Sequence, residues 1–384
     1  MLFPTITVPK TIAKSILQGH PWVYADPKLP DLPPVGTPLR LVNSKGKNIA
    51  FGIVDEGSIV VRVLGTQPDS IPNLLRREIQ SAALLRRRII DHSSTTCYRM
   101  INGPGDGLPG IVVDRYNDLA VLRLYGKCWE PWLKDICISL LELHEFKSVF
   151  RRFGVRRVDG SSGGRLLAGE SFLETLIVTE NGLKFVVRPR VGQKTGLFLD
   201  QREHRAHIGR IANQHTVANL FSYTGGFSVY AAAGGAKRVF SVDISKPAIE
   251  DAKENFRLNG LDPDKHIFLA ADAFQWESPE PLSLLICDPP SLSHDHKKDS
   301  NASKAYEELA THCAKQLRRG DLLATASCTS RLSQSKWENA VAWGLKRHGR
   351  WAWLWRAAEP PDHPVSTFHP EGRYLKFSIA AKMR

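Results

Sequence analysis

Apolar and polar positions change their spacing along this chain, and the changes divide it into parts. In the C-terminal half, short apolar runs alternate with longer segments whose apolar residues recur every three or four positions. Runs of the first kind are typical of buried strands, and segments of the second kind are typical of amphipathic helices. The expected strands are 217–221, 239–243, 267–271, 282–287, 322–327, 351–356 and 374–381. The expected helices are a short one ending near residue 235, followed by 245–260, 302–317 and 335–346. This alternation predicts an α/β domain built on an open, largely parallel sheet.

The N-terminal half has a different pattern. Its first part contains short strand-like runs, and the residues Ser44-Lys45-Gly46-Lys47 between two of them indicate a hairpin turn. We therefore expect a small β-rich module over residues 5–65. The part that follows mixes helices at 73–91 and 131–143 with strands at 111–114, 119–125 and 148–152. We expect it to form a small α+β domain. The predicted domains are residues 1–70, 71–178 and 179–384.

The charge of the chain indicates a polyanionic partner. The formal net charge is +13 and the isoelectric point is about 9.5. The excess is clustered in arginine groups that precede the expected α/β domain, at 76–77, 86–88, 151–152 and 156–157. Each cluster alone could be an ordinary solvated face, but together they favour RNA or DNA as the partner.

Other features of the composition limit the classes of protein. No apolar run is long enough for a membrane span, and the first residues lack the pattern of a secretory signal. A soluble, cytoplasmic protein is therefore expected. The six cysteines form no C-x-x-C pair, so neither a zinc site nor a disulfide framework is indicated, and we predict no metal.

A glycine turn follows the first strand of the α/β domain. Residues 222–227 contain the adjacent pair Gly225-Gly226, which lets a ligand approach the backbone next to the N-terminus of a helix. Asp243 ends the next strand, where a carboxylate can accept both hydroxyl groups of a ribose. The G-x-G-x-x-G spacing that binds a pyrophosphate is missing. We therefore expect a nucleoside cofactor without one, such as S-adenosylmethionine (SAM). The alternative is that the two glycines only end a strand of an unrelated α/β core.

Two further strand ends carry acids. Asp272 is placed to accept the adenine amino group, and the N–H of Ala273 can bind a ring nitrogen. Asp288-Pro289-Pro290 forms a rigid turn that can hold a flipped base beside the methyl donor. Any one of these aspartates could be only a helix cap. Their shared place at the carboxyl ends of strands favours a ligand site.

Cys328 ends the following strand and is the candidate nucleophile. The C5 carbon of a pyrimidine becomes reactive only after a thiolate has added to C6, so C5 methylation needs a cysteine at this place. Positive charge from Arg331 and from the sulfonium could keep the thiol ionised, and Asp288 could hold N3 and the amino group of cytosine. The alternative is a buried structural thiol, which is the interpretation that we give to Cys287.

Several segments carry a resemblance to a known family. They are 19–24 (Gly-His-Pro-Trp-Val-Tyr), 105–115, 193–202, 219–227, Asp288-Pro-Pro290, Ser327-Cys-Thr329, 362–365 and 370–372. In this ordered set the chain resembles the bacterial large-subunit (23S) ribosomal RNA cytosine-5 methyltransferases with an N-terminal PUA domain. The resemblance implies a PUA domain, a small linker domain and a Rossmann-like class I methyltransferase domain. It also implies that SAM is the cofactor, that Cys328 is the nucleophile, that 5-methylcytosine is the product and that a homodimer is reasonable.

The expected contacts extend beyond these groups. We place 191–202 as a lid over SAM, and the expected cofactor-binding residues are Lys194, Thr195, Phe198, Asp200, Arg202, Phe221, Tyr223, Thr224, Gly225, Gly226, Asp243, Ile244, Asp272, Ala273, Asp288 and Pro289. The expected RNA-binding residues are His20, Trp22, Arg86, Arg87, Arg151, Arg152 and Arg331. For Trp22, a place in the core of the β-rich module is the alternative.

Two other functions remain open on the sequence. The family often has Lys-Phe after the Asp-Pro-Pro turn, whereas this chain has Ser291-Leu292. A guanine-amino methyltransferase would use the Asp288 turn and would not need Cys328. A non-catalytic RNA-binding assembly factor would use only the basic clusters, with RNA affinity that depends steeply on salt.

Overall fold

The computed structural model describes residues 3–153, 163–192, 196–292, 299–330 and 332–383. The chain divides into two compact units. The first comprises Met1–Val178, Val187–Leu199 and Pro361–Gly372, and the second comprises Thr179–Val186, Asp200–Pro360 and Arg373–Arg384. The segments 187–199 and 361–372, which the sequence places in the third domain, thus pack with the first unit. The three-domain boundaries remain a prediction, because this division groups residues 1–178 together.

The first unit begins with a five-stranded sheet in the order β1-β3-β4-β5-β2. Its elements are β1 (Thr5–Thr7), α1 (Lys10–Leu17), β2 (Trp22–Tyr24), β3 (Pro38–Val42), β4 (Asn48–Val54) and β5 (Ile59–Gly65). The hairpin expected around Ser44–Lys47 joins β3 to β4, and the side chain of Asn43 accepts hydrogen bonds from the N–H groups of Lys45 and Lys47. A β-rich N-terminal module is therefore confirmed.

A second five-stranded sheet in this unit has the order β10-β9-β8-β7-β6. Its elements are α2 (Ile71–Ile89), β6 (Cys97–Asn102), β7 (Ile111–Tyr116), β8 (Leu119–Leu124), α3 (Leu133–Leu141), β9 (Ser148–Arg152) and β10 (Gly164–Gly169). Ser70 caps α2 by accepting a hydrogen bond from the N–H of Asn73. The sequence predicted every element of this sheet except β6 and β10. Both are hard to see in the pattern, since β6 interleaves polar and apolar residues irregularly and β10 begins and ends on glycine.

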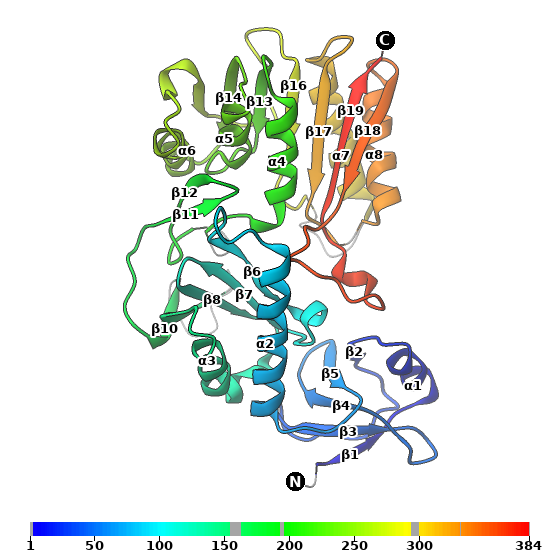
Figure 1. Ribbon diagram of the computed structural model, residues 1–384. Coiled ribbons are helices and arrows are strands. Elements are labelled where there is room, and N and C mark those ends of the chain that lie inside the picture. The colour runs from blue at the N-terminus through cyan, green and yellow to red at the C-terminus, as the bar shows by residue number, and fades with distance from the viewer. Residues whose placement is uncertain (1–2, 154–162, 193–195, 293–298, 331, 384) are drawn as a thin grey trace. The chain divides into compact units, whose positions relative to one another are not determined.

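The second unit is an α/β domain around a seven-stranded sheet in the order β15-β14-β13-β16-β17-β19-β18 (Figure 1). Its strands are β13 (Thr216–Leu220), β14 (Arg238–Asp243), β15 (Ile267–Ala270), β16 (Leu284–Cys287), β17 (Leu322–Ser327), β18 (Trp351–Ala357) and β19 (Lys376–Lys382). Its helices are α4 (Arg202–Ile211), α5 (Gly226–Ala233), α6 (Lys246–Leu258), α7 (Asp299–Lys315) and α8 (Gln334–Lys346). All neighbouring pairs from β15 to β17 are parallel, and β19 runs antiparallel to both of its neighbours. A hairpin of β11 (Leu176–Glu180) and β12 (Leu183–Val187) precedes α4.

Helices lie on both faces of this sheet (Figure 1), and apolar clusters fill the space between the helices and the strands. Residues of α4 and α5 pack with Leu284 and Ile286 of β16, whereas residues of α7 and α8 pack with Leu285 and Cys287 of the same strand. Successive side chains of a strand point to opposite faces, so a strand covered on both sides must be apolar throughout. This explains the continuous apolar runs in the sequence and confirms the expected Rossmann-like fold.

Candidate active site

A left-handed turn connects β13 to α5. Phe221, Tyr223 and Gly225 have φ angles of 58°, 48° and 76°. At Gly225 a Cβ atom would lie 2.8 Å from the Cβ of Ala252 on α6, so this position requires glycine for space as well as for conformation. The turn rests on buried polar contacts, since Ser228 Oγ accepts a hydrogen bond from Asn219 (2.9 Å) and lies 2.7 Å from Ser241 Oγ. The backbone at the end of β13 is therefore fixed before any ligand arrives.

Asp243 joins this turn to the end of β14. Its Oδ2 accepts a hydrogen bond from the N–H of Tyr223 (2.8 Å), and its Oδ1 accepts one from the N–H of Ser245 (2.9 Å). Each oxygen of an ionised carboxylate has two lone pairs, so both can accept one more hydrogen bond. The half-buried carboxylate is thus held in place with capacity for two hydroxyl groups. The next side chain, Ile244, is 78% exposed.

The end of β15 supplies an acid and an aromatic ring. Asp272 is exposed, and its Oδ1 accepts a hydrogen bond from the N–H of Phe274 (2.9 Å), while Ala273 is buried. Phe274 is 45% exposed and meets Phe221 edge to face, with ring centroids 4.9 Å apart. Ile244 and Phe274 thus offer apolar surface at the ends of neighbouring strands, which suits a planar base. Phe274 was not among the expected site residues, although an aromatic residue two positions after the acid at a strand end could have indicated a place in the site.

A chain of hydrogen bonds fixes Asp288 at the end of β16. Gln201 Nε2 donates to Asp288 Oδ2 (3.1 Å), and Gln201 Oε1 lies 2.5 Å from Nδ1 of His204. His204 is buried on α4 and stacks on Phe377 with centroids 4.4 Å apart. Gln201 and His204 were not among the expected site residues, because nothing in the pattern of the sequence indicates a helix that begins at residue 202.

This buried histidine predicts a pH dependence of stability. Burial lowers the pKa of His204 to about 4, so its ring is neutral in the folded protein near pH 7. In the unfolded chain the ring takes up a proton near pH 6.5, so the unfolded state binds more protons between these two values. Stability should therefore fall by about 3 kcal/mol as the pH drops from 6.5 to 4, and remain at its full value above 6.5.

Urea denaturation at several pH values measures this effect. His204→Gln should remove that part of the acid loss, whereas His215→Gln, which changes a half-exposed ring, should keep it. An unchanged acid loss in His204→Gln would show that other groups cause it.

Cys328 follows directly after β17, the strand next to β16. The two strands are parallel and pair Cys287 with Thr325, so Cys328 and Asp288 come at the same edge of the sheet. Cys328 is half-buried, whereas the other five cysteines are buried. Tyr306 of α7 lies within electrostatic reach of both Cys328 and Asp288, and its burial raises the pKa of the hydroxyl, which stays protonated. This edge therefore combines a partly accessible thiol, a fixed carboxylate and a neutral hydroxyl.

Comparison with known proteins shows the family of the chain. A family model described as an S-adenosylmethionine-dependent methyltransferase matches residues 151–325, and a PUA-like domain model matches residues 6–66. The ribosomal RNA large subunit methyltransferase of Deinococcus radiodurans is 35% identical over 396 residues, covering 97% of this chain and 95% of the relative. The ribosomal RNA large subunit methyltransferase I of Tolumonas auensis is 34% identical, covering 97% and 98%. The chain belongs to this methyltransferase family.

Solved structures share the fold of the methyltransferase. A protein from Streptococcus mutans described as a SAM-dependent methyltransferase superposes with a TM-score of 0.87 at 22% identity, covering 99% of this chain and all of that one. A second, SMU.776, complexed with S-adenosylhomocysteine, gives the same TM-score at 23% identity. The cofactor of the family is SAM. The residues at the ends of β13, β14 and β15 fit its adenosine part, because they combine a carboxylate with spare acceptor capacity and exposed apolar side chains.

The fit to SAM predicts an effect of Asp243. Asp243→Ala should weaken SAM binding about 10- to 100-fold, because charged hydrogen bonds to the ribose are lost. Calorimetric titration with SAM measures the change. Glu250→Ala on the exposed side of α6 is the matched control and should leave the affinity unchanged. Equal affinities of wild type and Asp243→Ala would remove this carboxylate from the cofactor site.

The other expected cofactor contacts of the methyltransferase lie in different surroundings. Thr224 and Pro289 lie in the turns at this edge of the sheet, and Gly226 begins α5. Asp200 is buried and accepts a hydrogen bond from the hydroxyl of Tyr374 (2.7 Å), and Arg202 is also buried. Phe198 is in the first unit. Lys194 and Thr195 lie outside the described residues, as does Gln193 of the expected lid.

One expected RNA contact needs correction. Arg86 is fully buried and forms a two-pronged ion pair with Asp106, and it also donates to the carbonyl oxygens of Arg99 and Asp362. A guanidinium without exposed surface cannot reach a phosphate, so Arg86 stabilises the first unit and is not an RNA contact. Its neighbour Arg87 is about half exposed and pairs with Glu145.

The remaining candidates for RNA contacts have mixed surroundings. Arg151 pairs with Glu130, and Arg152 donates to backbone carbonyl groups, including that of Gly192 at 2.8 Å. Trp22 packs edge to face on His369 with centroids 4.1 Å apart, in agreement with a packing role, and His20 Nε2 lies 3.4 Å from a carboxylate oxygen of Glu371. Arg331 lies outside the described residues.

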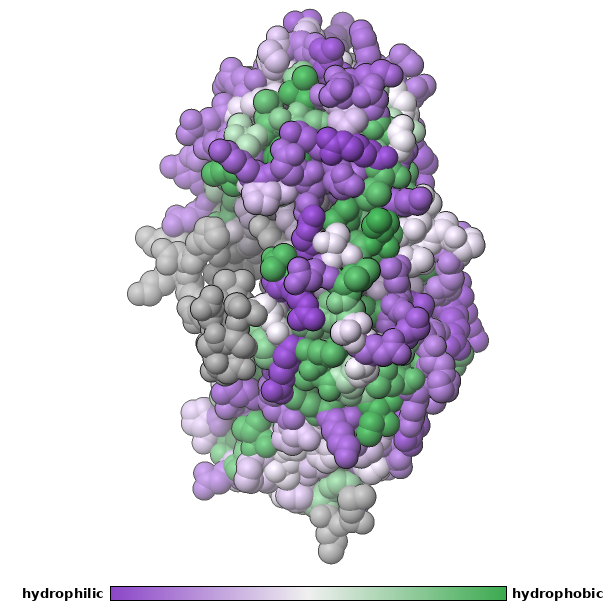
Figure 2. Space-filling view, turned by 90° about the vertical axis from the view of Figure 1, so that its left-hand side faces the viewer, coloured by the Kyte–Doolittle hydropathy of each residue, from purple (hydrophilic) through white to green (hydrophobic). Residues whose placement is uncertain are grey.

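Apolar side chains reach the surface in both units, as the green areas of Figure 2 show. In the second unit, the large apolar side chains of the described residues that are more than half exposed are Ile244, Trp343 and Leu354. Of these, Ile244 follows directly after a parallel strand, at the edge of the sheet that carries the site. No helix among the described residues is long and apolar enough to cross a membrane.

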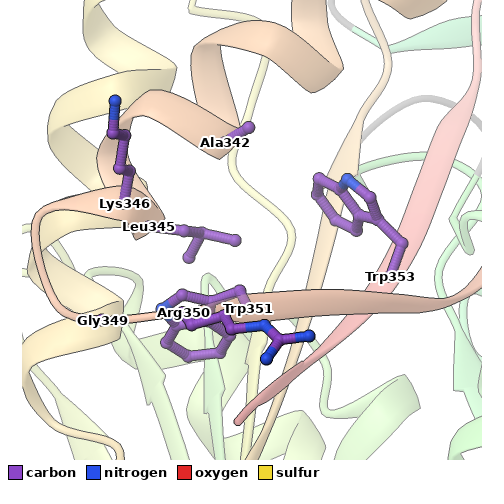
Figure 3. Close-up of a pocket in the computed structure, with 7 residues that line it drawn as sticks. All are labelled: Ala342, Leu345, Lys346, Gly349, Arg350, Trp351 and Trp353. Atoms are coloured by element: carbon purple, nitrogen blue, oxygen red, sulfur yellow. The ribbon is translucent and has the colours of Figure 1, made fainter. Parts of the chain in front are cut away.

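A separate cavity of about 230 Å³ lies at the other end of the sheet (Figure 3). Side chains of α8, of β18 and of the connection between them line it, among them Leu345, Lys346, Arg350, Trp351 and Trp353. Trp351 pairs with Lys382, and the neighbouring pair along β19 joins Ala381 to Leu322, at the start of β17. The cavity is therefore at the amino ends of the parallel strands, away from Asp288 and Cys328.

Proposed function

We propose that this methyltransferase transfers a methyl group from SAM to C5 of a cytosine in large-subunit (23S) ribosomal RNA. The observation that carries the proposal is the pair Asp288 and Cys328 at the ends of two neighbouring parallel strands. The relatives named as ribosomal RNA large subunit methyltransferases support the RNA class, as does the net charge of +13. Amino methylation needs no thiol, whereas C5 methylation requires one.

The thiolate of Cys328 starts the reaction by forming an S–C6 bond. The electron pair of the C5–C6 π bond then moves to C5, and negative charge develops on the pyrimidine. Bound SAM supplies an electrophilic methyl group and leaves as S-adenosylhomocysteine with the electron pair of the broken bond. A base takes the proton from C5, the C–H pair restores the C5–C6 double bond, and Cys328 leaves as thiolate.

Asp288 would orient the base and balance its charge. Its carboxylate can accept a hydrogen bond from the cytosine amino group and share a proton with N3 as the ring gains charge. Gln201 holds that carboxylate in one orientation through its 3.1 Å hydrogen bond. The protonated hydroxyl of Tyr306 adds a neutral donor near both reacting groups.

RNA would be bound by surface charges in addition to this site. We propose the guanidinium groups of Arg87, Arg151, Arg152 and Arg331 as phosphate contacts, which would make the affinity strongly dependent on salt. His20 and Trp22 are proposed as further RNA contacts. The expected homodimer is also a proposal.

Nucleoside mass analysis tests the function. Ribosomal RNA is incubated with the full chain and SAM carrying an isotope-labelled methyl group, and labelled 5-methylcytidine is the expected product. Label on a purine amino group would favour the guanine-amino methyltransferase. RNA binding without any label would favour the assembly factor.

A further inference from the structure

Lys376 is a buried cation that the mechanism above does not use. It begins β19 and is 3% exposed. β19 runs antiparallel to β17, and Lys376 pairs with Ser327, the residue before Cys328. The two residues are distant in the sequence, so only the strand pairing brings the lysine next to the candidate nucleophile.

The ammonium of Lys376 is bound by carbonyl oxygens. Nζ donates to the carbonyl oxygens of Thr329 (2.6 Å) and Tyr374 (3.1 Å). Among the ion pairs found in the described part of the chain, none involves Lys376. Carbonyl groups satisfy its N–H donors but do not neutralise its charge, and a buried charge without a counter-ion is costly. Negative charge on Glu359 partly balances the ammonium, and an anion formed at Cys328, next to Thr329, would balance it further.

Charged and titratable groups from several elements surround this place. They are Glu359 after β18, Asp288 after β16, Tyr306 on α7 and Cys328 after β17. Burial lowers the pKa of Lys376, whereas negative charge on Glu359 and on Cys328 raises it. The Glu359 carboxylate already accepts the N–H groups of Tyr374 (2.6 Å) and Leu375 (2.8 Å). The interaction of Lys376 with Cys328 is mutual, so a cation stabilised by the thiolate also stabilises the thiolate.

We propose that Lys376 is a positioning residue whose ammonium group holds Cys328 as a thiolate before RNA binds. The proposal rests on the role of Cys328 in the proposed function. From the sequence, Arg331 and the sulfonium of SAM were expected to supply the positive charge that keeps Cys328 ionised. In this proposal Lys376 supplies it. An opposite charge within electrostatic reach of Cys328 favours the ionised thiol, and the thiolate is the reactive form.

Alkylation of Cys328 tests this without RNA or SAM. Iodoacetamide is added to the full chain from pH 5 to 10, and the rate at Cys328 is followed by the mass of its peptide. The pH midpoint of the rate gives the thiol pKa. In the wild type it should lie below the ordinary value of about 8.5. In Lys376→Met it should rise by at least about one pH unit, so that alkylation at pH values well below the midpoint slows about tenfold, and Lys376→Arg should stay close to the wild type.

Lys382→Met is the matched control. Lys382 ends the same strand, and its ammonium also donates to carbonyl oxygens, those of Ala314 (3.2 Å) and Leu317 (2.7 Å). Its removal should leave the alkylation midpoint of Cys328 unchanged. Melting curves of all variants show whether any of them loses its fold.

Two results would overturn the proposal. One is a wild-type midpoint at or above about 8.5, which needs no variant at all. The other is a Lys376→Met variant that has the alkylation midpoint of the wild type but a lower melting temperature. Lys376 would then only stabilise the backbone through its hydrogen bonds to carbonyl groups. Either result leaves the proposed function standing if methylation still requires Cys328. Conversely, methylation that survives Cys328→Ala would remove the proposed function and leave the measured thiol pKa unaffected.

Discussion

Cys328→Ala should reduce methylation of ribosomal RNA by a factor of at least about 10³, because without the thiolate C5 of cytosine gains no electron density. Binding of SAM should be unchanged, since the residues expected to hold the adenosine belong to β13, β14 and β15. Transfer of labelled methyl groups to RNA measures the first effect and calorimetric titration the second. Cys287→Ala is the matched control, because this thiol is 3% exposed on the neighbouring strand and belongs to an apolar cluster.

A covalent trap makes this prediction sharper. RNA containing 5-fluorocytidine has no proton at C5 to lose, so the thiolate cannot leave after methyl transfer. The wild type and Cys287→Ala should form a protein–RNA adduct that survives denaturation, and Cys328→Ala should not. Undiminished methylation by Cys328→Ala, or an adduct at another residue, would contradict the thiolate mechanism.

Arg86→Met should lower the free energy of unfolding by about 3–5 kcal/mol. The change leaves the carboxylate of Asp106 buried without its cationic partner, and among the described residues only the N–H of Asn102 (2.6 Å) still donates to it. Arg87→Met is the control on the same helix. Its guanidinium is 49% exposed in a pair with Glu145, and such pairs contribute about 1 kcal/mol or less.

Urea denaturation of the full chain measures both changes. In Arg86→Met combined with Asp106→Leu, much of the lost stability should return, because the unpaired charge is removed as well. Equal stabilities of Arg86→Met and Arg87→Met would contradict the structural role of Arg86.

The C-terminal sheet was predictable because the residues that specify each of its strands and helices lie within or next to that element. Strands buried on both faces are apolar throughout, and the helices between them carry their own start and stop residues. Ser245 caps α6 by accepting a hydrogen bond from the N–H of Ala248, and Gly260 follows this helix with φ of 68°. Strands β13 to β17 and helices α6 and α8 accordingly begin or end within a few residues of their predicted limits.

Helix α4 shows where local information fails. Its buried side includes His204 and Arg205, which a hydrophobic pattern reads as exposed positions. Arg205 is paired with Glu180 in a buried contact (2.6 Å), and His204 reaches Gln201 and the carbonyl oxygen of Ala358. Polar side chains can be buried where distant partners satisfy them, and those partners become neighbours only when the chain folds.

The sequence by itself determined the α/β class and the order of the strands along the chain. It also determined which of these strands end in an acid and which one ends in the thiol. These follow from spacing within short segments and from the rule that parallel strands collect their carboxyl ends at one edge. Only the tertiary structure decided that Arg86 is buried on Asp106, that Gln201 holds Asp288, and that Lys376 lies across from Ser327. Each of these contacts joins residues far apart in the chain, and their strength depends on burial, which spacing in a sequence does not record.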